Sequence, residues 1–288
     1  MTSRRVLGVI GGSGLYQIEG LAAVEEVRVE TPFGSPSDTV VRGQLGDTTL
    51  LFLPRHGRGH RIAPHCVDFR ANICALKKLG ATHLLGISAV GSMLEKIEPG
   101  HFVVVDQFID LTKKRASTFF DDGIVGHVGF AEPVCGELSG ALAVAAERAG
   151  ARVHRGGTYV CIEGPQFSTR AESLLYRSWG VSVIGMTAMP EAKLAREAEL
   201  PYALLALATD YDCWHESEQS VSVQAVLAVI HKNVALARRT VVELAQDLPD
   251  PTHSAATGAL KAALMTAPDK LRPEVLARLD WLIGEYVR

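Results

Sequence analysis

The amino-acid sequence predicts an α/β protein, built as a single domain with a central mixed, largely parallel, twisted sheet flanked by helices. Three observations predict this class. Short, almost wholly apolar runs are typical of strands that are buried on both faces of a sheet. Segments with helical periodicity lie between these runs, as they do in α/β proteins. The chain has 288 residues, of which 47% are hydrophobic, so it can bury a large core.

The first part of the chain is expected to contribute four strands and one helix. The first strand runs into Gly11, at a glycine-rich turn where the backbone is free to adopt positive φ. The third and fourth strands read as a hairpin that turns at Gly46-Asp47. The helix that follows ends at Gly80, a residue common just beyond a helix. The expected strands are 5–10, 24–29, 39–45 and 48–53, and the expected helix is 67–79.

The middle of the chain alternates strands with helices. Thr169 and Glu172 have the spacing of a capping box, which predicts a helix from there to about Trp179. Segment 110–127 is irregular and is a candidate rim loop. The other expected helices are 137–149, 190–199 and 220–244, and the expected strands are 82–87, 102–105, 157–162, 181–185 and 202–208.

The last segment, 250–288, is expected to form a short C-terminal helical extension of the domain that spans 1–249. Pro251, Pro268 and Pro273 break it into two short helices, because proline is not tolerated in a helix interior.

Composition excludes several classes of protein. The net charge of -3 gives no sign of a nucleic-acid surface or of a polybasic membrane anchor. No apolar run approaches the roughly 18 residues needed to span a bilayer, and the run near the N-terminus is too short for a signal peptide. The five cysteines are scattered, without a CxxC pair, as expected in a reducing compartment. We therefore expect a soluble, cytoplasmic protein without nucleic-acid or membrane partners.

Polar residues stand where separate apolar strands are expected to end. In open α/β sheets, ligands bind in the crevice beyond the carboxyl ends of the strands. Hydroxyl groups and an arginine that converge there make an anion cradle without a metal, because they offer directional donors and a positive charge. With carboxylates and an aromatic side chain nearby, this set suggests group transfer between phosphate and a planar heterocycle. The residues at these strand ends are Ser13, Arg55, His56, Ser88, Met186, Thr187, Thr209 and Asp210.

The loop 54–61, PRHGRGHR, has three interpretations. The arginine fork suits phosphate oxygens, which favours an anion site at Arg55. His56, His60 and His65 could instead bind a metal, but glycines break any helix that would hold them in register and no carboxylate nearby completes a set. A solvated basic loop is the third interpretation.

Asp210 and Asp212 follow a buried strand and have two interpretations. Carboxylates near a core are costly unless they are paired or used, so they could face a ligand. Alternatively, both are solvated loop residues, one of which caps a turn. Phe167, just before the helix that Thr169 caps, could likewise stack on a flat ring or act as a hydrophobic staple.

Eight motifs, found in order over roughly residues 6–245, resemble those of the trimeric purine nucleoside phosphorylase superfamily, and are most similar to its methylthioadenosine phosphorylase branch. The last forty or so residues match poorly. The motifs are GVIGGSGL, TPFGSPSD, PRHGRGHRIAPH, AVGS, EPGHFVVVDQFID, EGPQFSTRAE, MTAMPEAKLAREAEL and ATDYDCW.

The resemblance implies phosphorolysis of S-methyl-5′-thioadenosine to adenine and 5-methylthioribose 1-phosphate by a homotrimer, with inorganic phosphate as co-substrate and no metal or organic cofactor. Asp210 and His56 would be the catalytic residues. Phosphate would be held by Ser13, Arg55, His56, Ser88 and Thr187. The purine nucleoside would be held by Ala89, Phe167, Ser168, Met186, Thr209, Asp210 and Asp212, with His127, Val221 and Val223 at the methylthio group.

Substrate choice within the family stays open. Members that act on 6-oxo purines tend to carry Asn at the position of Asp210 and Glu at that of Ser168, so this chain favours 6-amino purines. In the family, the C-terminal part of a neighbouring subunit closes the 5′ pocket. The C-terminal sequence of this chain departs from the family's pattern. Methylthioinosine phosphorylase and a broader purine nucleoside phosphorylase remain alternatives, and a non-catalytic nucleoside-binding protein is the alternative from another class.

Overall fold

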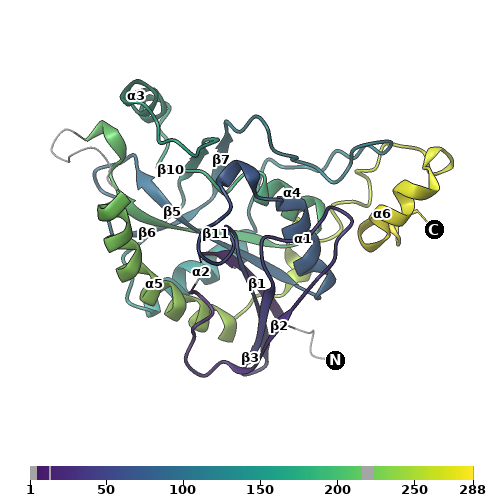
Figure 1. The fold of residues 1–288 in the computed structure, drawn as a ribbon, viewed down its shortest axis with the longest axis horizontal. Helices are drawn as coiled ribbons and strands as arrows, with labels where there is room; N and C mark the ends of the chain where they lie inside the picture. The colour runs from purple at the N-terminus through teal and green to yellow at the C-terminus, as the bar shows by residue number, and fades with distance from the viewer. Residues whose placement is uncertain (1–4, 13, 216–222, 288) are drawn as a thin grey trace.

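The computed structural model describes residues 5–12, 14–215 and 223–287. Its centre is one mixed sheet, in which the described residues form eleven strands (Figure 1). The strands are β1 (Arg5–Gly11), β2 (Ala22–Val27), β3 (Val40–Leu45), β4 (Thr48–Pro54), β5 (His83–Ser92), β6 (Phe102–Val105), β7 (Gln107–Asp110), β8 (Val153–Arg155), β9 (Thr158–Cys161), β10 (Val183–Gly185) and β11 (Tyr202–Asp210).

The order along the main path of the sheet is β2-β3-β4-β1-β5-β10-β9-β7, and β11 pairs with β5 and β6. Most pairings are parallel, including β1 with β4 and β5, and β11 with β5. Antiparallel pairs join β2 to β3, β3 to β4, β10 to β5 and β11 to β6. The predicted fold class is confirmed.

Helices cover both faces of the sheet (Figure 1). Strand β1 shows why its apolar run is continuous: Val6 and Ile10 pack in one core cluster, and Leu7 and Val9 pack in the other. Helices α1 and α4 contribute to the first cluster, and α2 and α5 contribute to the second. The described helices are α1 (Phe69–Lys78), α2 (Gly136–Arg148), α3 (Arg170–Ser178), α4 (Glu191–Glu197), α5 (Val223–Gln246) and α6 (Pro273–Ile283). None of them is long and apolar enough to cross a lipid bilayer.

Two helix boundaries follow from local sequence as predicted. The Thr169 side chain accepts a hydrogen bond from the Glu172 amide, and the Glu172 carboxylate accepts one in return from the Thr169 amide, so the capping box is confirmed. Helix α1 is followed by Gly80, whose φ of 87° is a left-handed conformation that favours glycine.

Strand β5 is longer than the sequence predicts. The predicted strand ends at 87, whereas β5 runs to Ser92. Ser88 is therefore inside a strand and not beyond its end. The continuation is paired on both sides, in parallel with β11 and, at Gly91 and Ser92, antiparallel with β10. Small residues there give a weak sequence signal for a strand, but the neighbouring strands supply the hydrogen bonds.

Other differences lie at the edges of the molecule. The short strands β7 and β8 were not predicted, and β2 begins two residues before the predicted 24–29 and is largely exposed. The tail holds one α-helix, α6, instead of two; Pro251 and Pro268 each begin only a single 3-10 turn. Helix α6 still packs its buried face, including Leu279 and Ile283, into the cluster of α1 and α4.

Candidate active site

Two hydroxyl groups meet where β5 passes the segment after β10. The Oγ of Ser88 lies 2.9 Å from the Oγ1 of Thr187, and both residues are buried. The side chain of the next residue, Ala89, points to the opposite face of β5 and is exposed, as the alternation of a strand requires. The structure therefore brings together two of the hydroxyl groups that the sequence predicts for a phosphate site.

Arg55, at the end of β4, is enclosed by the protein. Its Nε lies 2.8 Å from Glu191 Oε2, and its Nη2 lies 3.0 Å from Glu191 Oε1. Its Nη1 donates to the carbonyl of Ile87, and Nη2 also donates to that of Ile10. A guanidinium has five N–H groups, and these contacts use four of them: the N–H of Nε, one N–H of Nη1 and both N–H groups of Nη2.

The sequence analysis expected the fork of Arg55 to face phosphate, and this expectation needs correction, because the fork is occupied by Glu191. Among the described residues, one N–H on Nη1 stays outside these contacts. Phosphate binding by Arg55 stays a prediction, and it is limited to one hydrogen bond, donated by the remaining N–H of Nη1. Burial opposes the charge of Arg55, but the adjacent Glu191 carboxylate outweighs it, and the net effect raises the pKa of Arg55. The pair ties β1 and β5 to the first residue of α4.

His56 is neutral over the ordinary pH range. Burial and the nearby charge of Arg55 lower its pKa to about 4. Its Nδ1 lies 2.8 Å from the carbonyl oxygen of Ile62, which can only accept, so Nδ1 carries the proton. The Nε2 atom is then an acceptor. Such a group suits a protonated phosphate oxygen better than an ionised one.

Asp210, the last residue of β11, is held by two hydrogen bonds. The hydroxyl of Thr209 lies 2.7 Å from its Oδ2, and the backbone N–H of Asp212 donates to its Oδ1 over 2.8 Å. Each carboxylate oxygen therefore has a defined direction. Asp210 pairs with Gly91 in the sheet register, close to the strand segment that carries Ser88.

Asp212 is buried, so the solvated-loop interpretation is wrong for this residue. Its Oδ2 accepts a short hydrogen bond from the hydroxyl of Ser173 in α3. Burial raises the pKa of Asp212, while the Ser173 contact opposes that shift. Of the two aspartates, Asp210 is half-buried, whereas Asp212 is buried against Ser173 of α3.

The segment before α3 lies next to the end of β11. The Cys213 thiol donates to the carbonyl oxygen of Ser168 over 3.5 Å, which connects the two segments. The Oγ of Ser168 is buried and has no hydrogen-bond partner among the described residues. Phe167 is 54% exposed, so it does not pack as a hydrophobic staple.

Arg115 fixes the backbone around Met186 and was not predicted. Its Nη1 donates to the carbonyls of Met186 and Met189, over 2.7 and 2.6 Å, and its Nη2 donates to that of Glu163 over 2.7 Å. Its Nε pairs with the Glu163 carboxylate. Arg115 lies in the irregular segment, and nothing in the local sequence indicates that its guanidinium would be buried against two strand ends.

One predicted residue lies elsewhere, and three others lie wholly or partly outside the described residues. His127 is exposed and lines a separate hollow of about 240 Å³ together with Ser117, Lys193 and Glu197. Ser13 and Val221 lie outside the described residues. Val223 begins α5, and its side chain also lies outside what the structure describes.

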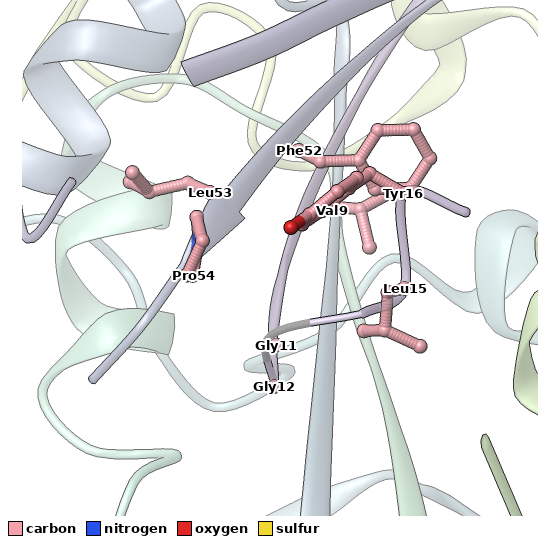
Figure 2. Close-up of a pocket in the computed structure, with 8 residues that line it drawn as sticks. All are labelled: Val9, Gly11, Gly12, Leu15, Tyr16, Phe52, Leu53 and Pro54. Carbon is pink, nitrogen blue, oxygen red and sulfur yellow. The ribbon is translucent and has the colours of Figure 1, made fainter. Parts of the chain in front are cut away.

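A second, apolar hollow lies at the end of β1. Figure 2 shows Gly11 and Gly12 at the turn beside Leu53 and Pro54 of β4, with Tyr16 nearby. Neither hollow contains Ser88, Thr187 or Asp210, so the chemical groups, and not the concave shape, identify the candidate site.

The histidines of the 54–61 loop gain no support as a metal site. The rings of His56 and His60 are stacked, with centroids 4.3 Å apart. Across the described part of the chain, no group of three or more His, Cys, Asp or Glu residues is arranged to hold a metal ion.

Comparisons with known proteins show to which family the chain is related. A sequence model of the phosphorylase superfamily matches residues 6–246. The S-methyl-5′-thioadenosine phosphorylase of Geobacter sulfurreducens is 57% identical over 284 residues, which cover 98% of this chain and 99% of that protein.

Two solved structures are similar over most of the chain. A methylthioadenosine phosphorylase from an antarctic soil metagenomic library has a TM-score of 0.91 at 47% identity, covering 97% of this chain and 99% of the other. The methylthioadenosine phosphorylase of Schistosoma mansoni in complex with adenine has a TM-score of 0.83 at 38% identity, covering 91% and 99%.

Proposed function

The chain belongs to the phosphorylase superfamily, and on that premise we propose that it cleaves S-methyl-5′-thioadenosine with inorganic phosphate, giving adenine and 5-methylthioribose 1-phosphate. It is thus a phosphate-dependent pentosyltransferase of purine and methionine salvage. Its relatives with 49–57% identity over nearly their full length act, by their names, on this nucleoside.

One observation about the chain's own residues carries the proposal. Ser88 lies on β5, in contact with Thr187 after β10, and Asp210 lies on the neighbouring strand β11; the register partner of Asp210 is Gly91, three residues beyond Ser88. At the rise of a strand, this spacing is about 10 Å. A ribose fits between a phosphate at one end and a purine ring at the other.

The chemistry follows from this placement. Breaking the N-glycosidic bond builds positive charge on the sugar, as in glycoside hydrolysis. Phosphate, held by the hydroxyls of Ser88 and Thr187 with His56 as acceptor, stabilises that charge and attacks the anomeric carbon. The departing purine gathers negative charge, and Asp210 stabilises it from the protonated carboxyl form, whose O–H donates a hydrogen bond or its proton to N7. The hydrogen bonds from the Thr209 hydroxyl and the Asp212 backbone N–H fix the orientation of the Asp210 carboxyl group for this interaction.

A 6-amino purine is favoured because Asp210, with Asp212 and Ser168 near it, presents acceptors to an exocyclic amino group. The buried, unpartnered hydroxyl of Ser168 supports its place in this pocket. Phe167 lies against the base and Met186 at the ribose hydroxyls. The reaction requires no metal or organic cofactor, because phosphate is the nucleophile.

The assembly is proposed to be a homotrimer in the cytoplasm. Exposed apolar side chains on α3 and at its C-cap, those of Leu174, Leu175 and Trp179, offer a surface for another chain. His127 is exposed, and in an assembly it is available to a neighbouring chain's 5′ pocket. The five free cysteines support a reducing compartment. Sedimentation would test the trimer: a stable monomer contradicts it.

The experiment for the reaction itself is product identification. Phosphorus NMR should show a sugar 1-phosphate that forms in equal amount to adenine. Adenine with free methylthioribose, and no phosphate ester, would identify a hydrolase instead.

A further inference from the structure

Tyr159 of β9 lies beside the side chains of Ser88 and Thr187, whose hydroxyl groups are proposed to bind phosphate. It has no role in the reaction described above. Its side chain is fully buried. Its hydroxyl oxygen lies 3.3 Å from the Oγ of Ser88 and 3.4 Å from the backbone nitrogen of Thr187. A single phenol therefore contacts both residues of the hydroxyl pair.

The protein makes room for this phenol at Gly185. A Cβ atom at that position would lie 2.0 Å from the Tyr159 hydroxyl oxygen and 2.7 Å from the ring carbon that carries it. Both distances are far below van der Waals contact, so any larger residue would displace the ring. Strands β9 and β10 pair in parallel, with Tyr159 opposite Val183 and Cys161 opposite Gly185, and this register fixes where the Tyr159 ring lies relative to Gly185.

The direction of the protons follows from the contacts. The Thr187 N–H donates to the Tyr159 oxygen, since an amide cannot accept there. Burial raises the pKa of Tyr159 to about 12, so its O–H is retained at working pH. This O–H is then available to the Ser88 oxygen. When Ser88 accepts from Tyr159, the proton of Ser88 can turn from the carbonyl of Ala89, which lies 3.2 Å from its Oγ, toward an anion.

We propose that Tyr159 is a positioning residue of the phosphate site, whose O–H directs the hydroxyl protons of Ser88 and Thr187 toward the bound anion. The proposal rests on the phosphorolysis proposed above, which makes phosphate the ligand. Without the phenol O–H, Thr187 and Ser88 satisfy each other across their 2.9 Å contact, and one proton fewer faces phosphate.

The test is Tyr159→Phe, which removes the hydroxyl and keeps the ring. We expect KM for phosphate to rise about five- to tenfold, the scale of one hydrogen bond. KM for the nucleoside, and kcat at saturating phosphate, should stay within about twofold. Tyr286→Phe is the matched control, because Tyr286 donates to Glu199 over 2.9 Å at a distance from the site. An unchanged phosphate KM, or equal rises in both KM values, would overturn the proposal.

A double-mutant cycle tests whether Tyr159 affects phosphate binding through the hydroxyl group of Ser88. In a Ser88→Ala background, Tyr159→Phe should add less than about twofold to the phosphate KM, since coupled residues are not additive. Fully additive effects of the two substitutions on the phosphate KM would contradict an action of Tyr159 through Ser88. Gly185→Ala should give the same phosphate-selective defect if Tyr159→Phe does not fold, because the added methyl group displaces the phenol.

Calorimetry with inorganic phosphate alone separates this proposal from the reaction. If the wild type binds phosphate but does not release adenine, the proposed function fails, while weaker phosphate binding by Tyr159→Phe still supports the role of Tyr159. Equal phosphate binding by both proteins overturns that role whatever the reaction is.

Discussion

Arg55 and Glu191 form a buried, two-bond ion pair, with Nε–Oε2 and Nη2–Oε1 distances of 2.8 and 3.0 Å. The Tyr202 hydroxyl donates to the same carboxylate over 3.0 Å. The pair holds the carbonyl of Ile87, the residue before Ser88, through Nη1. The arginine that the sequence analysis predicts for phosphate thus acts first on the backbone next to Ser88, one of the two hydroxyl residues proposed to bind phosphate.

Glu191→Gln should therefore destabilise the fold strongly. It leaves the charge of Arg55 buried without a counter-ion, and removing one partner of such a pair costs about 3–5 kcal/mol. Urea denaturation monitored by circular dichroism measures the change. Glu147→Gln is the control, because it breaks the exposed pair with Arg155 and should shift the midpoint little. Similar denaturation midpoints for both variants would show that Glu191 does not stabilise the buried charge of Arg55.

Asp210→Asn should change base selectivity. The amide presents a donor in place of one carboxylate acceptor, which weakens contact with a 6-amino group and suits a 6-oxo group. We expect kcat/KM for methylthioadenosine to fall by the loss of about 1.5–3 kcal/mol, the range for a hydrogen bond to a charged group. The loss for methylthioinosine should be smaller. Equal losses for both nucleosides would mean that Asp210 does not distinguish the 6-position.

His56 should remain neutral down to about pH 4. Its folded pKa lies below the ordinary value of 6.5, so between these two values the unfolded chain binds a proton that the native protein does not. Its contribution to stability is therefore present above about pH 6.5 and is lost as pH falls toward 4. Nitrogen NMR of the ring, assigned with His56→Asn, should give a midpoint near 4 and a proton on Nδ1. A midpoint near 6.5 would contradict the buried, neutral role.

Chelators should not affect turnover, because the proposed reaction uses phosphate and protein groups alone. Activity measured after dialysis against EDTA should equal that of the untreated enzyme. Loss of activity that added zinc or magnesium restores would revive a metal site at His56, His60 and His65. Titration with several divalent ions would then identify the metal.

The sequence predicts the fold well because its apolar runs and caps are local signals. The run at 202–208 marks the central strand β11, and Thr169 with Glu172 marks the start of α3. The paired extension of β5 past Ser88 depends on two other strands, and no local pattern records it.

The candidate site is predictable as a set of chemical groups but not as a set of contacts. Ser88, Thr187 and Asp210 could be selected from their places after apolar runs. The partner of Arg55 could not, since Glu191 is 136 residues away in the chain. The same holds for Tyr159, which reads as a core residue of a short strand until its hydroxyl is placed beside Ser88.

The most direct measurement of the central claim is adenine release from methylthioadenosine, with and without phosphate, beside methylthioinosine, adenosine and inosine. We predict release that requires phosphate and saturates with it, and that is fastest with methylthioadenosine and faster than hypoxanthine release from inosine. Faster cleavage of methylthioinosine would move the chain to the 6-oxo members of its family. No base release from any of the four nucleosides in the presence of phosphate would contradict the proposed function.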